Sequence, residues 1–109
     1  MSKLKVLVFA PGEKPVVQEI DKGLEAMQAV VGGYIECVGL APGIDLYCNE
    51  EGKLIGLPLN LRKKNPMAIA GGLPGDIIAG TFFVTRTNDE GESESLTDAD
   101  IKKYTKLIG

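Results

Sequence analysis

The residues best suited to bind a ligand form a short basic segment in an otherwise acidic chain. The segment Arg62-Lys63-Lys64 lies between two asparagines, whereas the whole chain has a formal net charge of −3 at pH 7. Cations and amides grouped in this way bind phosphate groups, nucleotides or acidic protein surfaces, and the alternative is a solvated loop without a ligand. A glycine pair follows and would allow a ligand to approach the backbone closely. The predicted ligand-binding residues are Asn60, Arg62, Lys63, Lys64, Gly71 and Gly72.

Patterns typical of catalysis are weak. The chain contains no histidine, so the commonest general base of enzymes is missing. Glu50 and Glu51 form a carboxylate pair in a predicted turn, where both groups would be solvated, and a carboxylate-dependent enzyme is therefore the least favoured hypothesis. A phosphate-binding loop needs G-x-x-x-x-G-K-[ST] between a strand and a helix, whereas Gly71-Gly72 precedes a predicted strand. We expect no catalytic residue and no cofactor.

The two cysteines, Cys37 and Cys48, both lie in apolar segments with the composition of strands. They could face each other across neighbouring strands as a disulfide or redox pair. The favoured interpretation is that both are buried thiols that act as small hydrophobic side chains. Two cysteines without a histidine argue against a zinc site or a catalytic metal, so no metal ligand is predicted.

Composition indicates one folded domain spanning residues 1–109. Hydrophobic residues make up 44% of the chain and charged residues 25%, values typical of a globular protein. The acidic balance argues against general nucleic-acid binding, which usually requires a basic face. We expect no membrane segment, because no apolar run approaches the roughly 20 residues of a span. The first residues do not resemble a signal peptide, and we expect a cytoplasmic location.

A predicted hairpin at residues 44–60 positions the basic segment. Apolar and polar residues alternate from 44 to 49, as in a half-buried strand. Residues 49–52 form a turn signal in which Gly52 would take a positive φ, and residues 53–55 are predicted to form a short return strand. Pro58 lacks an N–H for a ladder, so the chain is expected to bend there.

The remaining patterns predict the rest of a mixed fold. A strand at 3–9 forms a hairpin with one at 16–20, and residues 34–38 form a further strand. A helix at 24–31 is predicted to begin after an Asp21 cap and to end at Gly32-Gly33. Residues 76–87 carry large apolar groups on both faces, which indicates an interior strand, and Gly80 marks a bulge or a close backbone approach. Thr97 caps a last helix. The predicted class is α+β, with a mainly antiparallel sheet of five or six strands, two helices and the order β-β-α-β-β-β-β-α.

Several short motifs follow one another along nearly the whole chain. They are residues 5–8 with Pro11-Gly12 and Pro15, 19–21 with Leu24, Gln28 with 31–36, 49–54, 56–60, 76–83 and 96–98. Their order and spacing resemble a family of small proteins from bacteriophages and mobile elements that carry domain of unknown function 3846. The resemblance implies a phage or mobile-element accessory protein of the bacterial cytoplasm. Such proteins often bind host factors, including defence systems, and the family supplies no catalytic residue to transfer.

Three functional hypotheses follow. The leading one is a non-catalytic binding module that modulates a host factor, defence factors included, through a protein surface. The second is a small-ligand or nucleotide binder that uses Asn60, Arg62 and the Gly71-Gly72 loop, and the third is the carboxylate-dependent enzyme. The expected partner is accordingly a protein or a small anionic ligand, and a homodimer is a further option for so small a domain.

Overall fold

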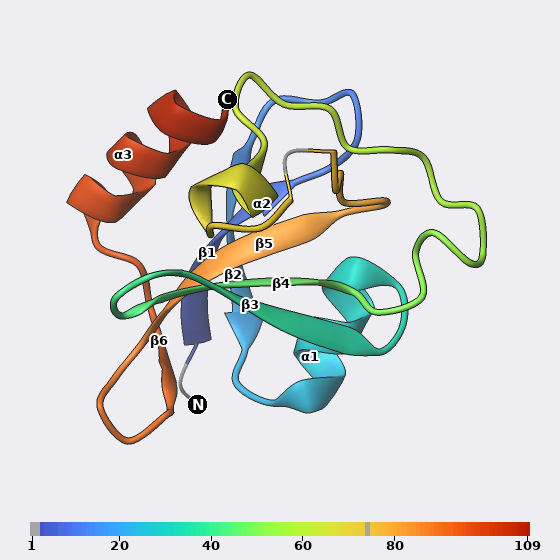
Figure 1. Ribbon diagram of the computed structural model, residues 1–109. Helices are drawn as coiled ribbons and strands as arrows, with labels where there is room; N and C mark the ends of the chain where they lie inside the picture. The colour runs from blue at the N-terminus through green and yellow to red at the C-terminus, as the bar shows by residue number, and fades with distance from the viewer. Residues whose placement is uncertain (1–2, 74) are drawn as a thin grey trace.

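The computed structural model describes residues 3–73 and 75–109 and shows an antiparallel sheet with helices on both faces (Figure 1). The predicted α+β class is confirmed, with a short third helix in addition to the two that were predicted. The elements are β1 (Lys3–Phe9), β2 (Val16–Asp21), α1 (Leu24–Val31), β3 (Ile35–Ala41), β4 (Ile44–Asn49), α2 (Pro66–Ile69), β5 (Phe82–Thr87), β6 (Ser93–Glu94) and α3 (Asp98–Ile108). In the described part of the chain, no helix has the length and apolar character needed to span a bilayer.

β5 lies in the interior of the sheet. The strand order is β2-β1-β5-β4-β3, and β6 pairs with the end of β5. Val84 of β5 lies opposite Leu7 of β1 and Leu46 of β4, so the prediction of an interior strand is confirmed. The strand begins only at Phe82, because Gly80 has a φ of 92° and turns the backbone out of the extended conformation.

Each face of the sheet carries its own core, because alternate residues of every strand point to opposite faces. Helix α1 packs over one face, and its core is built from Leu4, Val6, Ile20, Met27, Val31 and Phe83. Helices α2 and α3 pack over the other face. That larger core includes Leu7, Phe9, Leu46, Phe82, Val84, Tyr104 and Ile108. Within it the rings of Phe9 and Phe82 stack with their centroids 4.8 Å apart.

The predicted hairpin at residues 44–60 is wrong in its second half. β4 pairs instead with the preceding strand β3, which continues past its predicted end through a bulge between Gly39 and Ala41. The predicted return strand at 53–55 is a turn, because the N–H of Ile55 bonds locally to the carbonyl of Glu51 at 3.0 Å. Gly52 does not take a positive φ. It is needed for space, since a Cβ there would collide with the carbonyl oxygen of Ala79.

The helix termini follow the sequence predictions with one exception. Thr97 and Asp100 form a reciprocal capping box at the start of α3, and Gly32 ends α1 with a φ of 78°. The predicted cap Asp21 instead lies at the end of β2, where it pairs with Lys3. Gly23 occupies the cap position of α1 without a side-chain bond, because β2 extends through Asp21, the residue predicted to cap the helix.

Candidate functional site

Asn60, the first of the predicted ligand-binding residues, faces the protein interior. Asn60 is buried, with only 2% of the residue exposed. The amide nitrogen donates hydrogen bonds to the carbonyl oxygens of Phe9 at 2.9 Å and Gly80 at 2.7 Å. The amide oxygen accepts one from Nε of Arg62 at 2.6 Å. Every hydrogen-bonding atom of this side chain therefore has a partner within the chain.

Arg62 completes the same network. Its guanidinium donates to the carbonyl oxygens of Ala10 and Glu13 in the turn after β1, and it lies 5.2 Å from the centroid of the Phe9 ring. Partial burial lowers the pKa of the guanidinium below its ordinary value. We call Asn60 and Arg62 the bracket, since together they join the long loop before α2 to the end of β1.

The other four predicted residues lie apart from the bracket's contacts. Lys63 and Lys64 are exposed, and the backbone N–H of Lys64 bonds to the last turn of α3. Gly71 and Gly72 follow α2, where the N–H of Gly72 donates to the carbonyl of Met67 at 2.8 Å. The structure thus joins Asn60 to Arg62 by a direct bond. A ligand site that uses all six residues stays a prediction.

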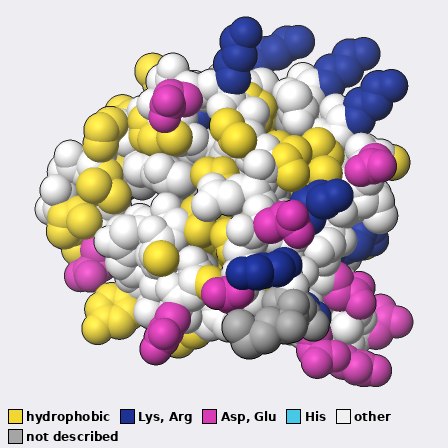
Figure 2. Space-filling view, turned by 180° about the vertical axis from the view of Figure 1, so that it is seen from behind, with side chains coloured by type: hydrophobic (Ala, Val, Ile, Leu, Met, Phe, Trp, Pro, Cys, Tyr) yellow, Lys and Arg dark blue, Asp and Glu magenta, His cyan; other side chains and the backbone are white. Residues whose placement is uncertain are grey.

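An exposed apolar loop precedes the basic segment, and the sequence analysis missed it. We call residues 54–61 the apolar loop. Four of its large aliphatic side chains face solvent, with exposures of 85% for Leu54, 59% for Ile55, 53% for Leu59 and 68% for Leu61, while Leu57 is half-buried against Gly80. Hydrophobic side chains gather on the side of the molecule that carries this loop, along the left edge of Figure 2. The signal in the sequence was the run LIGLPLNL itself, which was interpreted as a strand and a bend.

The apolar loop is held in place by its backbone. The N–H of Asn60 donates to the carbonyl of Ile78 at 2.8 Å, and the N–H of Gly80 donates to the carbonyl of Pro58 at 2.7 Å. Leu59 and Ala79 form an isolated antiparallel bridge. In this extended segment alternate side chains point in opposite directions, so the polar Asn60 points inward while Leu59 and Leu61 point outward. The usual arrangement of polar and apolar residues is inverted here.

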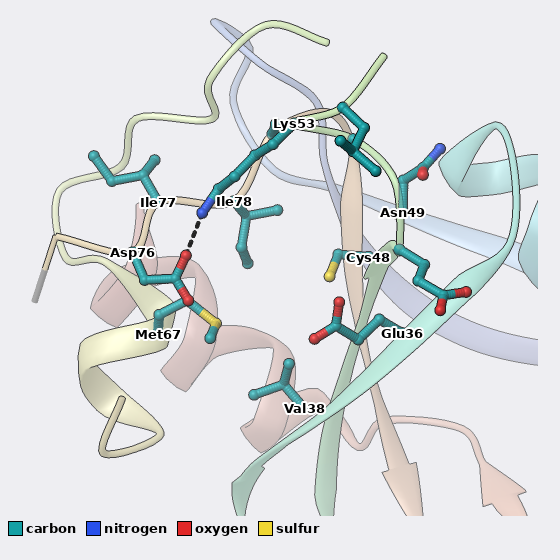
Figure 3. Close-up of a pocket in the computed structure, with 13 residues that line it drawn as sticks. Glu36, Val38, Cys48, Asn49, Lys53, Met67, Asp76, Ile77 and Ile78 are labelled. Atoms are coloured by element: carbon teal, nitrogen blue, oxygen red, sulfur yellow. Dashed lines mark hydrogen bonds and ion pairs between the residues drawn. The ribbon is translucent and has the colours of Figure 1, made fainter. Parts of the chain in front are cut away.

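A cavity of about 270 Å³ adjoins the start of the apolar loop (Figure 3). Glu36 and Cys48 project into it from β3 and β4, and Met67 and Asp76 lie across from them. Its apolar lining consists of Val38, Leu54, Met67, Ile77, Ile78 and Ala79. Helix α2 presents Met67 there because Asn65 caps the helix and accepts a bond from the N–H of Met67 at 3.1 Å.

The charges at the cavity are mainly negative. Lys53 and Asp76 form an ion pair at its rim, whereas Glu36 and Glu50 have no ion-pair partner among the described residues. Burial and then the nearby carboxylates of Glu36 and Asp76 raise the pKa of the Cys48 thiol to about 11. The thiol is therefore protonated at neutral pH and is a poor nucleophile.

The cysteine prediction is half correct. Cys48 is buried, but Cys37 is exposed. Partial desolvation of the Cys37 thiol, followed by the charge of Asp45, raises its pKa. The pairing of β3 with β4 places Cys37 opposite Tyr47 and Cys48 opposite Glu36, so the two thiols point to opposite faces of the sheet. A disulfide between them is excluded in this fold. Within residues 3–73 and 75–109 no group of three or more potential metal ligands is found.

Comparison with known proteins gives one match. A family model described as Domain of unknown function (DUF3846) matches residues 4–109, which is nearly the whole chain. Searches of the curated proteins and of the solved structures found no match.

Proposed function

Since the chain belongs to the family described as Domain of unknown function (DUF3846), we propose from its geometry that it is a non-catalytic binding module whose apolar loop docks on a partner protein. One observation carries the proposal. Leu59 and Leu61 are directed to solvent while Asn60 between them is buried. A loop under no demand beyond folding would gain stability by burying leucines, so this inversion points to a surface kept for contact.

The organisation of the apolar loop supports the same function. A binding loop that is already ordered loses less conformational entropy on association. Here the bracket and the bridge between Leu59 and Ala79 hold the backbone in one conformation. The leucines are thus presented by a fixed support, as the apolar centre of an interface requires.

The charges beside the apolar loop suggest the polarity of the partner. Lys63 and Lys64 follow the loop directly and are exposed. A partner that covers the apolar loop would meet these lysines at its rim, where an acidic patch would favour association and speed the encounter.

The cellular setting is part of the proposal. The family likeness supports a phage or mobile-element accessory protein that acts in a bacterial cytoplasm on a host factor, including factors of defence systems. The alternative of a nucleotide or small anionic ligand at Asn60, Arg62 and Gly71-Gly72 gains no support from the contacts, because the polar atoms of the bracket already bond to carbonyls and to each other.

A capture experiment with matched variants tests the proposal. Tagged wild-type protein and the variants Leu54→Glu and Leu61→Glu are exposed to bacterial lysate, with Leu24→Glu as the control. Leu24 is comparably exposed, at 57%, but lies on α1 at the other face of the sheet. We expect one partner to be retained by wild type and by Leu24→Glu and lost by both loop variants. Equal capture by all four proteins would contradict the proposal.

A further inference from the structure

The cavity beside the apolar loop holds polar groups that nothing in the described chain satisfies. Cys48 is 6% exposed and its thiol is directed into the cavity, yet it has no hydrogen-bond partner there (Figure 3). The Glu36 side chain also points into this space and is unpaired among the described residues. The thiol is a weak donor packed in the core, whereas the Glu36 carboxylate is exposed at the cavity without a cation beside it, so it is the group there that is available to a cationic partner from outside.

The balance of charge decides which kind of partner fits. Three carboxylates, Glu36, Glu50 and Asp76, line the cavity against the single cation Lys53. That cation is already paired with Asp76. Two negative charges are left uncompensated, so the cavity favours a cation and repels phosphate or carboxylate groups.

The size of the cavity limits the occupant further. Pockets for nucleotides and drug-sized ligands measure roughly 300–1,000 Å³, and this cavity, at about 270 Å³, is slightly smaller. Part of its lining is apolar and includes Val38, Met67 and Ile78. One long side chain with an aliphatic stem and a charged end matches both the volume and the lining.

We infer that the cavity receives an arginine side chain of the partner protein, with its stem against Met67 and Ile78 and its guanidinium at the Glu36 carboxylate. A carboxylate binds the planar guanidinium through two parallel hydrogen bonds, which an ammonium group cannot reproduce. Arginine is also enriched among the residues that dominate protein interfaces. The inference rests on the proposed function, since it names the chemistry that the partner brings.

The position of the cavity favours a protein as the source of this cation. Leu54, the most exposed leucine of the apolar loop, also lines the cavity. A partner that covers Leu54 would therefore pass directly over the opening. β3, which carries Glu36, is an edge strand of the sheet.

The test uses capped amino acids as probes. Isotopically labelled protein is titrated with Nα-acetylarginine methylamide and, separately, with the uncharged near-isostere Nα-acetylcitrulline methylamide, while backbone amide shifts are followed by NMR. We expect saturable shifts at Glu36, Cys48 and Ile78 with arginine only. Glu36→Gln should weaken binding about tenfold, the loss of one charge-assisted interaction. Glu19→Gln is the matched control, because Glu19 is exposed on β2 at the opposite edge of the sheet.

Three results would overturn the inference. They are equal binding of the citrulline probe, unchanged affinity in Glu36→Gln, and shifts that map away from the cavity. The apolar-loop variant Leu61→Glu should bind the arginine probe as wild type does, because Leu61 does not line the cavity. If the arginine probe fails while the loop still captures a partner, the inference falls alone. If capture fails while arginine binds, docking through the apolar loop is overturned and only the affinity of the cavity for a guanidinium remains.

Discussion

The bracket and the cavity are two polar regions with opposite relations to the fold. In the bracket, the amide of Asn60 and the guanidinium of Arg62 bond to backbone carbonyls from three separate parts of the chain. In the cavity, Glu36 and Cys48 face empty volume and lack partners among the described residues. Polar side chains that already have partners stabilise a structure, whereas unpaired ones beside a cavity are available to a ligand.

This difference explains why charge and residue type alone did not locate the site. Arg62 attracted attention as a cation in an acidic chain, but its donors lie against carbonyl groups. Glu36 lies in an ordinary strand sequence and gave no signal. What separates the two residues is the set of atoms around each side chain, and that set is assembled from distant parts of the chain.

The largest effect is expected from removing the amide at the centre of the bracket. In Asn60→Leu the buried carbonyls of Phe9 and Gly80 lose a donor, and the free energy of unfolding should fall by about 3 kcal/mol. Urea unfolding measures the change. A loss below about 1 kcal/mol would mean that the bracket does not stabilise the fold, and the contrast with the cavity would fail.

Arg86 and Asp100 form an ion pair within the chain, and this pair should make the free energy of unfolding depend on pH in the acid range. The guanidinium of Arg86 bonds to both oxygens of the carboxylate, at 2.8 and 2.9 Å, and lowers the pKa of Asp100 to about 2. The ionised form therefore stabilises the folded state above about pH 4, and about 2 kcal/mol of this stability should be lost as the pH falls towards 2.

Urea unfolding at several pH values checks this dependence. The stability difference between wild type and Asp100→Asn should shrink as the pH falls through the window. Asp98→Asn is the matched control, because Asp98 lies in the same helical turn but is exposed. A difference that stays constant down to pH 2 would show that the pair is not coupled to folding in the way the contacts indicate.

Arg62→Ala should lower the free energy of unfolding by about 1.5 kcal/mol, since it removes hydrogen bonds to the turn after β1 and the contact with the Phe9 ring. The neighbouring Lys63→Ala should change it by less than about 0.5 kcal/mol, because Lys63 is exposed. Thermal or urea unfolding distinguishes the two. Equal effects would place Arg62 with the surface lysines and would favour the ligand-binding interpretation of the basic segment.

The smallest effect on stability is expected in the cavity. Glu36→Gln removes a charge that has no ion-pair partner in the described structure, so the free energy of unfolding should change by less than about 0.5 kcal/mol. The same urea titrations measure it. A large loss would assign Glu36 a structural role and would remove the contrast on which the arginine site depends.

Local patterns in the sequence were sufficient for most of the fold. The span of α1, the Thr97 cap and the strand β1 depend on residues within one or two turns or along one strand, so neighbours in the chain carry the information. The turn at residues 53–55 was mistaken for a strand. Its apolar residues have the composition of a strand, and only the close approach of Gly52 to Ala79 excludes that conformation.

By itself the sequence determined the α+β class, the interior strand β5, the end of α1, the cap of α3 and the absence of histidine, because these follow from composition and from short-range periodicity. Only the tertiary structure decided that Asn60 is buried, that Leu59 and Leu61 are exposed, and that Glu36 and Cys48 share a cavity with residues of α2. The direction of a side chain in an irregular segment depends on which distant backbone groups accept its hydrogen bonds. Those acceptors, the carbonyls of Phe9 and Gly80, come together with Asn60 only in the folded protein.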